Sequence, residues 1–591
     1  MNRITSPRFI PLVLSLGIVL GILIGNFYAN HYAGNRLSII NTSSNKLNDL
    51  LHIIDDQYVD PVNMSDLVEK AMPQILKELD PHSTYVSAKD VEASMQDLKG
   101  SFSGIGVQFF IYQDSVRIVR VINGGPSESV GIKDGDRIIG INKKAYTGKD
   151  VSIDSTYRLL KGPKDSKIEL EIYRPSIHKK LTFAITRNDV PINSVTAAYM
   201  ADQTTGYIKI NSFAETTYSE FLAALANLHR QGFKGLIIDL RGNLGGYLDP
   251  AIRMAMEFLP KDRLIVYTQG RRSPRQDYKS DGRGAYQNLP LVVLVDEVSA
   301  SASEIFSGAI QDNDRGTIIG RRTFGKGLVQ EPIQFADGSM LRLTIARYYT
   351  PSGRCVQKPY TQGDEEQYEN DLFLRAEHGE YFYKDSIKTS GKAYKTRLGR
   401  KVFGGGGIIP DIFIPRDTIG MTPYFKQAYT LNLLQEFAYV YSDKNRKELK
   451  QHTKLNELMN YLDKQNILEQ FAQFGSKNGL KRRNLMLKKS QKLFTRFIYG
   501  NIIDNIMDEQ SAIQYDNSSD PAMHEAIKIL HQGSAFPQLA RAKKKKFTTG
   551  FQQPYANVNI ASTFTRIFKL PYYATESTNQ KCHKRSLQKN A

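Results

Sequence analysis

Two short segments of the chain carry the residue types that could perform covalent chemistry. The first is a Ser-Ala-Ser-Ala-Ser-Glu run at 299–304, which follows the apolar run 291–295 and opens a predicted helix. A serine at such a strand-to-helix turn can present its hydroxyl above a sheet, with helix N–H groups behind it to receive negative charge. Serine is also a favoured helix N-cap, so each of the three serines taken alone could be structural.

The second segment is Thr-Phe-Gly-Lys-Gly-Leu-Val-Gln at 323–330, in which Lys326 stands between two glycines. An isolated lysine is usually a solvated surface charge. The small neighbours and the apolar Phe324 and Leu328 instead allow close packing, and burial favours the neutral amine. A neutral lysine can take a proton from a serine hydroxyl, so this pair could supply a nucleophile and a base without histidine.

Other kinds of chemistry have weaker support. Gly320-x-x-x-x-Gly325-Lys326 resembles a phosphate-binding loop, but Gly327 stands where such a loop needs Ser or Thr, and strand-like alternation follows. A Gly-x-Ser-x-Gly motif is absent, which argues against a lipase or esterase. Two cysteines, and 10 histidines without a HExxH motif or a clustered pair, predict no metal centre and no bound cofactor. A single disulfide between the two cysteines stays open.

The elements that must position these residues predict an α/β and β multidomain protein. The apolar runs 235–240 and 291–295 are typical of parallel strands covered on both faces. Periodicity and turn residues divide the chain into a head and apolar span at 1–30, a helical segment at 40–100, a β-rich domain at 101–188, an α/β core at 195–415, a basic helical region at 421–531 and a tail expected to be disordered at 532–591.

The N-terminal segment predicts an exported protein. Arg3 and Arg8 precede an uncharged apolar run from Phe9 to Tyr28, about 20 residues, which matches the ~30 Å hydrocarbon core of a bilayer. We expect a single-pass anchor in the inner (cytoplasmic) membrane, with a cytoplasmic head and the body on the periplasmic, extracytoplasmic side. A cleaved signal peptide is the alternative, although its apolar region would be shorter. Under either interpretation, we expect the rest of the protein to be exported.

The formal net charge of +19 is concentrated in the last third of the chain. Residues 421–591 hold 27 Lys and Arg against 13 Asp and Glu, whereas the first 420 residues hold 52 against 47. Neither an RNA-recognition signature nor a zinc-finger spacing accompanies this excess, so we expect no nucleic-acid partner and interpret the region as a solvated or membrane-proximal surface. An adaptor that touches nucleic acid or lipid headgroups stays an alternative for this region.

A glycine-rich loop opens the β-rich domain. In the Ser-Gly-Ile-Gly-Val segment at 103–107, glycines stand directly before a strand, where backbone N–H groups can form a concavity that suits a carboxylate. The glycines alone would also fit an ordinary hairpin. Together with the segments 125–139 and 160–163, however, they resemble a PDZ domain of the bacterial protease type. Such a domain would bind the C-termini of proteins, with 105–109 as the docking edge and Gly104, Ile105, Gly106 and Val107 as the binding residues.

The two chemical segments together resemble the C-terminal processing peptidases, also called tail-specific proteases. These are serine endopeptidases with a Ser/Lys dyad. The likeness covers 45–415 and rests on the run 299–305 followed by 323–330, with further matches at 58–60, 79–83, 239–246, 350–354 and 407–411. Leu244 is a departure, because proline is common at that position in the family.

The resemblance implies a crotonase/ClpP-like α/β peptidase core with an inserted PDZ domain. It implies that Ser301 is the nucleophile, Lys326 the general base and Gln330 a supporting glutamine. The oxyanion N–H groups would come from Ala302 and from Gly245 or Gly246, a choice that the sequence leaves open. It gives His82 no chemical role.

The implied function is that of a membrane-anchored endopeptidase. It would recognise protein substrates by their exposed C-terminal tails and cleave them through an acyl-enzyme. A catalytically silent PDZ scaffold that only binds tails is the alternative. The helical C-terminal region could support a homo-oligomer.

Overall fold

The computed structural model describes residues 15, 17–21, 43–149, 151–389 and 392–537. The chain divides into two compact units, Met1–Glu78 and Leu79–Ala591. The first contains α3 (Ser43–Gln57) and α4 (Met64–Lys77), and the Asn63 side chain caps α4 by accepting the Asp66 N–H. Most of the predicted apolar span at 9–28 lies outside the described residues. Within the part of the chain that is described, no helix has the length and apolar character needed to cross a bilayer.

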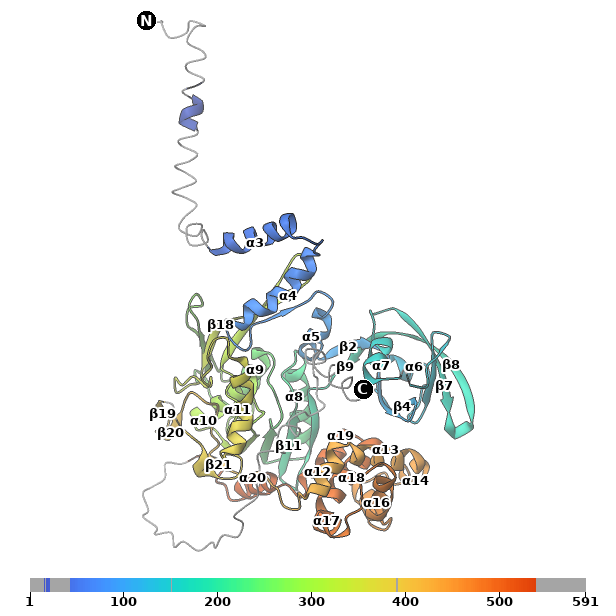
Figure 1. The fold of residues 1–591 in the computed structure, drawn as a ribbon. Helices are drawn as coiled ribbons and strands as arrows, with labels where there is room; N and C mark the ends of the chain where they lie inside the picture. The colour runs from blue at the N-terminus through green and yellow to red at the C-terminus, as the bar shows by residue number, and fades with distance from the viewer. Residues whose placement is uncertain (1–14, 16, 22–42, 150, 390–391, 538–591) are drawn as a thin grey trace, which may run out of the picture. The chain divides into compact units, whose positions relative to one another are not determined.

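A six-stranded sheet in the order β10-β11-β12-β15-β16-β21 forms the centre of the second unit (Figure 1). Its antiparallel edge is β10, and every other neighbouring pair is parallel. Both apolar runs of the sequence become central strands, β12 and β15. The strands are β10 (Val195–Met200), β11 (Thr205–Ile210), β12 (Gly235–Asp239), β15 (Leu291–Val295), β16 (Thr317–Gly320) and β21 (Ile412–Phe413).

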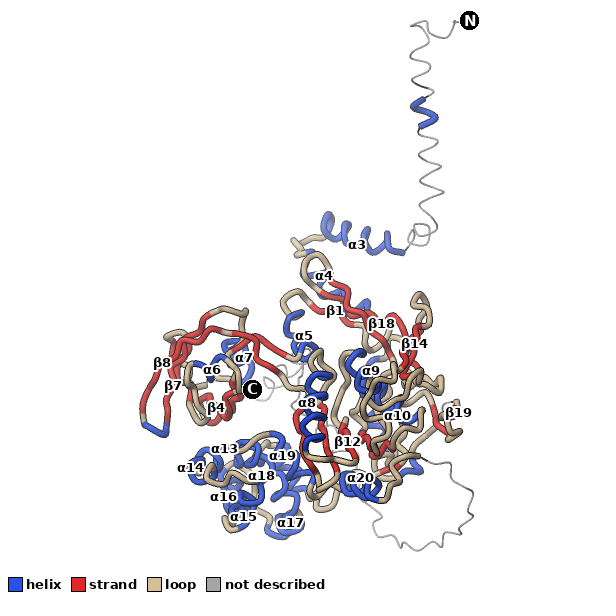
Figure 2. Tube along the Cα trace, turned by 180° about the vertical axis from the view of Figure 1, so that it is seen from behind, coloured by secondary structure: helices blue, strands red, loops and turns tan. Residues whose placement is uncertain are grey.

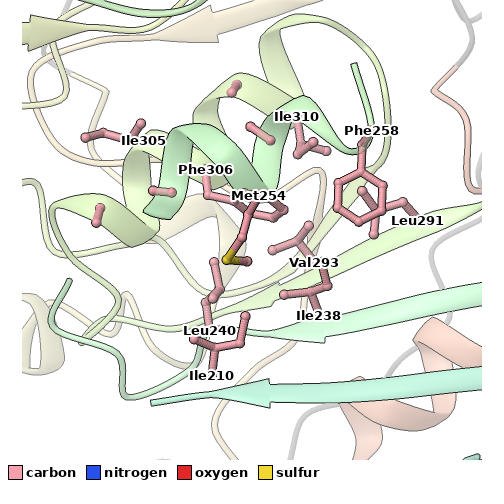
Figure 3. Close-up of a cluster of buried hydrophobic side chains, with 14 of the residues drawn as sticks. Ile210, Ile238, Leu240, Met254, Phe258, Leu291, Val293, Ile305, Phe306 and Ile310 are labelled. Atoms are coloured by element: carbon pink, nitrogen blue, oxygen red, sulfur yellow. The ribbon is translucent and has the colours of Figure 1, made fainter. Parts of the chain in front are cut away.

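Alternate side chains of the central strands enter two different cores, because successive residues of a strand point to opposite faces. Ile238 and Val293 pack with α8 (Thr217–Arg230), α9 (Leu248–Met256) and α10 (Ala302–Asp312). Figure 3 shows these two residues of the sheet beneath Met254 and Phe306 of the covering helices.

The opposite face is covered by α20 (Pro521–His531), the last helix described. Ile237 and Val292 from the sheet pack against Met523 and Ile529 of this helix. The core therefore includes a helix from beyond the predicted 195–415 boundary. The sequence predicts a helix at 521–531 from its period, but no local pattern in that segment predicts which element the helix packs against.

The predicted start of a disordered tail at 532 is wrong by several residues. Ala535 is 1% exposed, and its carbonyl accepts a hydrogen bond from the Thr317 hydroxyl at 2.8 Å. The Arg315 guanidinium lies 5.1 Å from the centre of the Phe536 ring. Ala535 and Phe536 thus contact the core, and the predicted tail from 538 onward lies outside the described residues.

A second sheet carries the loop that holds Lys326. Its path is β1-β18-β13-β14, and β17 also pairs with β18 (Figure 2). The strands are β1 (Thr84–Val86), β13 (Leu264–Gln269), β14 (Gln276–Lys279), β17 (Leu328–Gln334) and β18 (Met340–Tyr349). Smaller elements complete the core: α5 (Val91–Lys99), α11 (Glu365–Glu377), η3 (Lys384–Ser386) and the hairpin of β19 (Ala393–Lys395) with β20 (Lys401–Phe403).

The β-rich domain is a separate sheet in the order β3-β4-β5-β7-β8, entered and left through the paired strands β2 and β9. Its hydrophobic centre is lined by residues such as Ile118, Ile138 and Leu170, which are fully buried. Its elements are β2 (Ser101–Gly104), β3 (Val107–Tyr112), β4 (Ser115–Val121), α6 (Pro126–Ser129), β5 (Arg137–Ile141), β6 (Lys144–Ala145), α7 (Ile153–Leu160), β7 (Lys167–Arg174), η2 (Pro175–Ile177), β8 (Lys179–Thr186) and β9 (Asn188–Pro191).

The C-terminal region is helical, as its periodicity predicts. Its own core is formed by residues such as Phe437, Phe471, Phe494 and Ile502. The helices before α20 are α12 (Pro423–Thr430), α13 (Leu433–Lys444), α14 (Arg446–Leu449), α15 (Leu455–Asp463), α16 (Ile467–Lys477), α17 (Asn484–Lys489), α18 (Gln491–Ile506) and α19 (Glu509–Asn517). An α/β core, a β-rich domain and two helical regions confirm the predicted fold class.

Candidate active site

Ser301 lies in the turn between β15 and α10, where it is the N-cap of the helix. Its backbone has φ 54° and ψ −114°, a conformation that residues with a side chain rarely adopt. Such strain persists only where the surroundings fix it, and it is typical of functional turns. The Ser301 side chain is partly exposed.

The two neighbouring serines have structural hydrogen bonds. The Ser299 hydroxyl donates to the Leu240 carbonyl at 2.8 Å, and the Ser303 hydroxyl donates to the Asn243 carbonyl at 3.0 Å. Both side chains are fully buried. Of the three candidates from the sequence, Ser301 is therefore the one that is not fully buried.

Lys326 lies in the loop between β16 and β17, and its side chain points to Gln330. Its Nζ donates to Gln330 Oε1 at 3.1 Å. Burial lowers the pKa of this amine below its ordinary value, and Arg342 lowers it further, whereas the carboxylates of Asp80 and Glu304 raise it. The supporting glutamine that the resemblance implies is therefore in contact with this lysine. The loop leads directly into β17 and not into a helix, which removes the phosphate-loop interpretation.

A buried carboxylate joins the backbones of the two segments. Glu304 accepts hydrogen bonds from the Ser301 N–H at 2.9 Å and from the Lys326 N–H at 2.8 Å, and also from the Gly325 N–H and the Thr323 hydroxyl. Burial raises the pKa of Glu304 to about 7, although all these hydrogen bonds favour the ionised form. Sequence reasoning gave this residue no role, although the Ser-x-x-Glu spacing from Ser301 is a capping-box pattern.

Tyr348 makes a second connection between the same two residues. Its hydroxyl donates to the Ser301 carbonyl at 3.1 Å and also to the Lys326 carbonyl. The side chain is 1% exposed. No local pattern marks this tyrosine, because it lies in a strand among other aromatic residues. Glu304 and Tyr348 together hold the backbones of Ser301 and Lys326 next to one another, and the contact that the structure gives for the Lys326 amine is with Gln330.

The glycine turn at 242–246 lies directly against Ser301. A Cβ added to Gly245 would come within 2.7 Å of the Ser301 Cβ and 3.0 Å of the Ala302 nitrogen. The Gly245 N–H donates to the Asn243 side chain at 2.8 Å. The N–H groups of Gly246 and Ala302 form no hydrogen bond with any residue that the structure describes. Leu244, the departure from the family pattern, is 69% exposed.

Residues from distant parts of the chain support this turn. Arg241 pairs with Asp239 at 2.6 Å and also with Asp520, the N-cap of α20. Asp239 also accepts the Tyr207 hydroxyl at 2.8 Å. Although burial opposes ionisation, the cations of Arg241 and Lys209 lower the pKa of Asp239.

The surroundings of His82 favour its neutral form. Burial, followed by the nearby charge of Lys326, lowers its pKa to about 3. Its Nε2 shares a hydrogen bond of 2.9 Å with the Tyr368 hydroxyl. Its main-chain carbonyl accepts a hydrogen bond from Gln330 Nε2. Among the residues placed by the structure, no group of three or more His, Cys, Asp and Glu side chains could hold a metal ion.

The predicted tail-binding loop lies at the free edge of the β-rich domain. Among the described strands, β3 pairs only with β4, which leaves its other edge without a strand partner in that part of the chain, as strand addition requires. Ile105 is 2% exposed and its side chain packs in the domain core, so it can offer a ligand only its backbone. Gly106 has φ +76°, and a Cβ there would lie 3.3 Å from Pro126 Cδ. Tyr157 of α7 contacts Phe109 of β3 with ring centres 5.0 Å apart.

Models of three known families match the chain. Peptidase family S41 matches residues 204–367, the PDZ domain matches 117–174, and a family of unknown function matches 424–508. The first two confirm the resemblance stated from the sequence.

Individual relatives agree with these family models. A carboxy-terminal-processing protease of Bartonella bacilliformis is 35% identical over 319 residues, which are 53% of this chain and 72% of that protein. The carboxy-terminal processing protease CtpB of Bacillus subtilis is 34% identical over 318 residues, and the match spans 53% of this chain and 65% of that protein. The match therefore spans less than two thirds of CtpB. The solved photosystem II D1 C-terminal processing protease is 26% identical, with 64% of this chain and 95% of that chain covered and a TM-score of 0.33. The chain described here belongs to the carboxy-terminal processing proteases of peptidase family S41.

Proposed function

We propose that this protein is a serine endopeptidase that cleaves protein substrates selected by their C-terminal tails, with Ser301 as nucleophile and Lys326 as general base. One observation carries the proposal. The Glu304 carboxylate binds the backbone N–H groups of both Ser301 and Lys326, while the Lys326 amine is buried against Gln330. A buried amine in the neutral form is the base that a serine nucleophile requires when no histidine is present.

The reaction begins when the lone pair of Lys326 Nζ takes the proton of the Ser301 hydroxyl. The Ser301 oxygen forms a bond to the scissile carbonyl carbon, and the carbonyl oxygen becomes an oxyanion. Lys326 then gives its proton to the departing amine as the C–N bond breaks, which leaves an acyl-enzyme. Water loses a proton to Lys326 and attacks the ester, and the proton returns to Ser301 as the acid product leaves.

The N–H groups of Gly246 and Ala302 would receive the oxyanion. The Gly245 N–H is already used by Asn243, whereas the other two are not used by described residues. Ala302 begins α10, so the positive end of the helix dipole adds to the stabilisation of negative charge. Gly245 contributes by the absence of a side chain, because a Cβ would collide with Ser301.

The PDZ domain would select the substrate. Its open β3 edge fits strand addition by an extended tail, and the glycine loop at 104–106 fits the terminal carboxylate. We further propose that the segment 9–28 anchors or exports the protein, so that it acts on proteins outside the cytoplasm.

A digestion assay tests the chemistry. Lys326→Ala and Ser301→Ala should each reduce cleavage of a protein with an unstructured C-terminal tail by about 10³-fold or more, with tail binding unchanged. Ser299→Ala and Ser303→Ala are matched controls, and both should remain labelled by a fluorophosphonate at Ser301. A silent scaffold would bind tails without cleavage or labelling in the unsubstituted protein, and substantial cleavage by Lys326→Ala would contradict the assignment of the base.

A further inference from the structure

A tight turn at 80–83 lies beside Gln330 and is held by one buried carboxylate. Asp80 accepts hydrogen bonds from the His82 N–H at 2.9 Å, the Ser83 N–H at 3.0 Å and the Ser83 hydroxyl at 2.6 Å. Asp80 and Ser83 are 7% and 5% exposed. Because three donors converge on one side chain, the direction of the His82 carbonyl is set by Asp80.

The turn is attached to the strand that pairs with Gln330. The Thr344 N–H donates to the Ser83 hydroxyl at 3.1 Å, and the Thr344 hydroxyl donates to Asp80 at 3.1 Å. Thr344 is also the partner of Gln330 in the ladder between β17 and β18. The turn and the glutamine therefore share one attachment point, and their relative position is fixed.

This arrangement determines which way round the Gln330 amide lies. Its Nε2 donates to the His82 carbonyl, and its Oε1 accepts from Lys326 Nζ. Only one of the two amide orientations satisfies both contacts, since a carbonyl oxygen cannot accept from another oxygen that has no proton. The reversed amide would point its N–H groups at Nζ and occupy the lone pair that must take the Ser301 proton.

The His82 ring secures the other side of the same residue. It is bonded to the Tyr368 hydroxyl and meets the Tyr368 ring edge-on, with centres 5.1 Å apart. The ring therefore anchors the residue, and the main-chain carbonyl makes the contact with Gln330.

We propose that Asp80 is a positioning residue for the reaction: through the His82 carbonyl it holds the Gln330 amide with its oxygen toward Lys326, which leaves the lone pair of the amine free for Ser301. This inference rests on the proposed function of Ser301 and Lys326. It adds a role for the Leu-Asp-Pro-His-Ser segment at 79–83, which the sequence reading left without one.

A double-mutant cycle on the full-length protein tests the route of the effect. Asp80→Ala and Gln330→Ala should each lower kcat by about 10- to 100-fold with KM within about twofold, because a small displacement of a catalytic group has effects of this size. If Asp80 acts through Gln330, the double variant should be no slower than Gln330→Ala alone. A double variant slowed by the product of the two effects would overturn the proposal.

Asp90→Ala is the matched control. Asp90 accepts the Ser87 hydroxyl in a similar short turn before α5 and has no contact with Gln330. Both aspartate variants should lose thermal stability, but Asp90→Ala should keep kcat within about twofold. Loss of kcat in proportion to loss of melting temperature in both variants would show that Asp80 is only structural.

Titration of the Lys326 amine separates failure of this inference from failure of the proposed function. In protein labelled with ¹³Cε-lysine, and with Lys326→Arg to assign the resonance, Asp80→Ala should move the Lys326 titration to lower pH. Part of that movement is loss of the Asp80 charge, which like that of Glu304 raises the pKa of Lys326, whereas Arg342 lowers it. The rest comes from release of the Gln330 amide, whose oxygen no longer accepts from Lys326. Asp80→Ala should therefore lower the Lys326 titration more in the protein that retains Gln330 than in the Gln330→Ala background.

Equal movement in both backgrounds would overturn the positioning role even if the enzyme is active. Conversely, a protein that neither cleaves tails nor reacts with a fluorophosphonate, but shows the unequal movement, would refute the proposed function and keep this geometry.

Discussion

Lys326 illustrates how the site is built from a residue placed in an unfavourable environment. Its amine is surrounded by protein and loses water, yet it is not paired with a carboxylate in a short ion pair among the described residues. The ammonium form is therefore destabilised in the folded protein. The same burial that supplies a neutral base lowers the stability of the fold.

Lys326→Met tests this relation. The folded state disfavours the proton on Lys326, so between the lowered pKa and the ordinary value of 10.5 the unfolded chain binds more protons and stability rises with pH. Below the lowered pKa the amine is protonated in both states, and folding carries the full free-energy cost of burying the Lys326 ammonium. Methionine removes that cost, and we expect the variant to gain about 1 kcal/mol of unfolding free energy near neutral pH. Urea unfolding at several pH values measures it.

The gain should shrink as pH approaches 10.5, and activity should be lost throughout. A destabilised Lys326→Met protein at neutral pH would indicate that the amine is satisfied in the fold.

The sequence predicts some residues of the site and not others, for physical reasons. Ser301, Lys326 and Gln330 lie in two short motifs whose chemistry can be read locally. Tyr348 and Asp80 act on those motifs through contacts between segments far apart in the chain. No local pattern marks Tyr348, and the matched segment 79–83 contains Asp80 without showing what Asp80 contacts, because these contacts depend on the fold.

At the scale of elements, strand β3 and helix α7 form the part of the PDZ domain to which the proposed function assigns tail binding. β3 has a free edge, and Tyr157 on α7 is half exposed beside Phe109. The alternation of apolar residues predicts β3, β4, β5, β7 and β8 because each strand packs one face on the domain core. The loop before β3 is predicted by its glycines, since Gly106 has a positive φ.

Gly106→Ala should weaken tail binding. Its Cβ would approach Gly125 Cα at 3.2 Å and Pro126 Cδ at 3.3 Å, so the loop must shift. The control is Gly148→Ala, at φ +103° with nothing within 4 Å. In both variants a residue with a Cβ must adopt a positive φ, which costs about 1 kcal/mol of stability. Only Gly106→Ala should raise the Kd of a labelled C-terminal peptide, by about tenfold or more. Equal Kd values would place tail binding elsewhere.

At the scale of the whole second unit, the C-terminal helices contact both of the other parts. The Phe110 and Tyr439 rings stack with centres 4.7 Å apart, and Arg117 pairs with Asp443 at 3.0 Å, which joins the PDZ domain to α13. α20 completes the peptidase core and reaches the glycine turn through Asp520. The described part of this region, 421–537, is therefore an integral part of the fold, while most of the positive excess of 421–591 belongs to residues 538–591, outside the described residues.

Met523→Asp tests how strongly the core depends on α20. Met523 is 2% exposed and packs on the sheet, so a carboxylate there would be buried without a partner. We expect a loss of about 3 kcal/mol or more of unfolding free energy. His524→Asp makes the same change of charge on the exposed side of the same helix and should cost less than about 1 kcal/mol. Similar losses in the two variants would show that α20 is dispensable for the core.

The covering of the sheet by α20 also sets an order of events during biosynthesis. β12 ends at residue 239, and α20 begins at residue 521. A ribosome adds about 5–20 residues per second, so the apolar face of the sheet waits on the order of ten seconds or more for its cover. This face of the sheet therefore stays uncovered in the nascent chain until α20 has been synthesised.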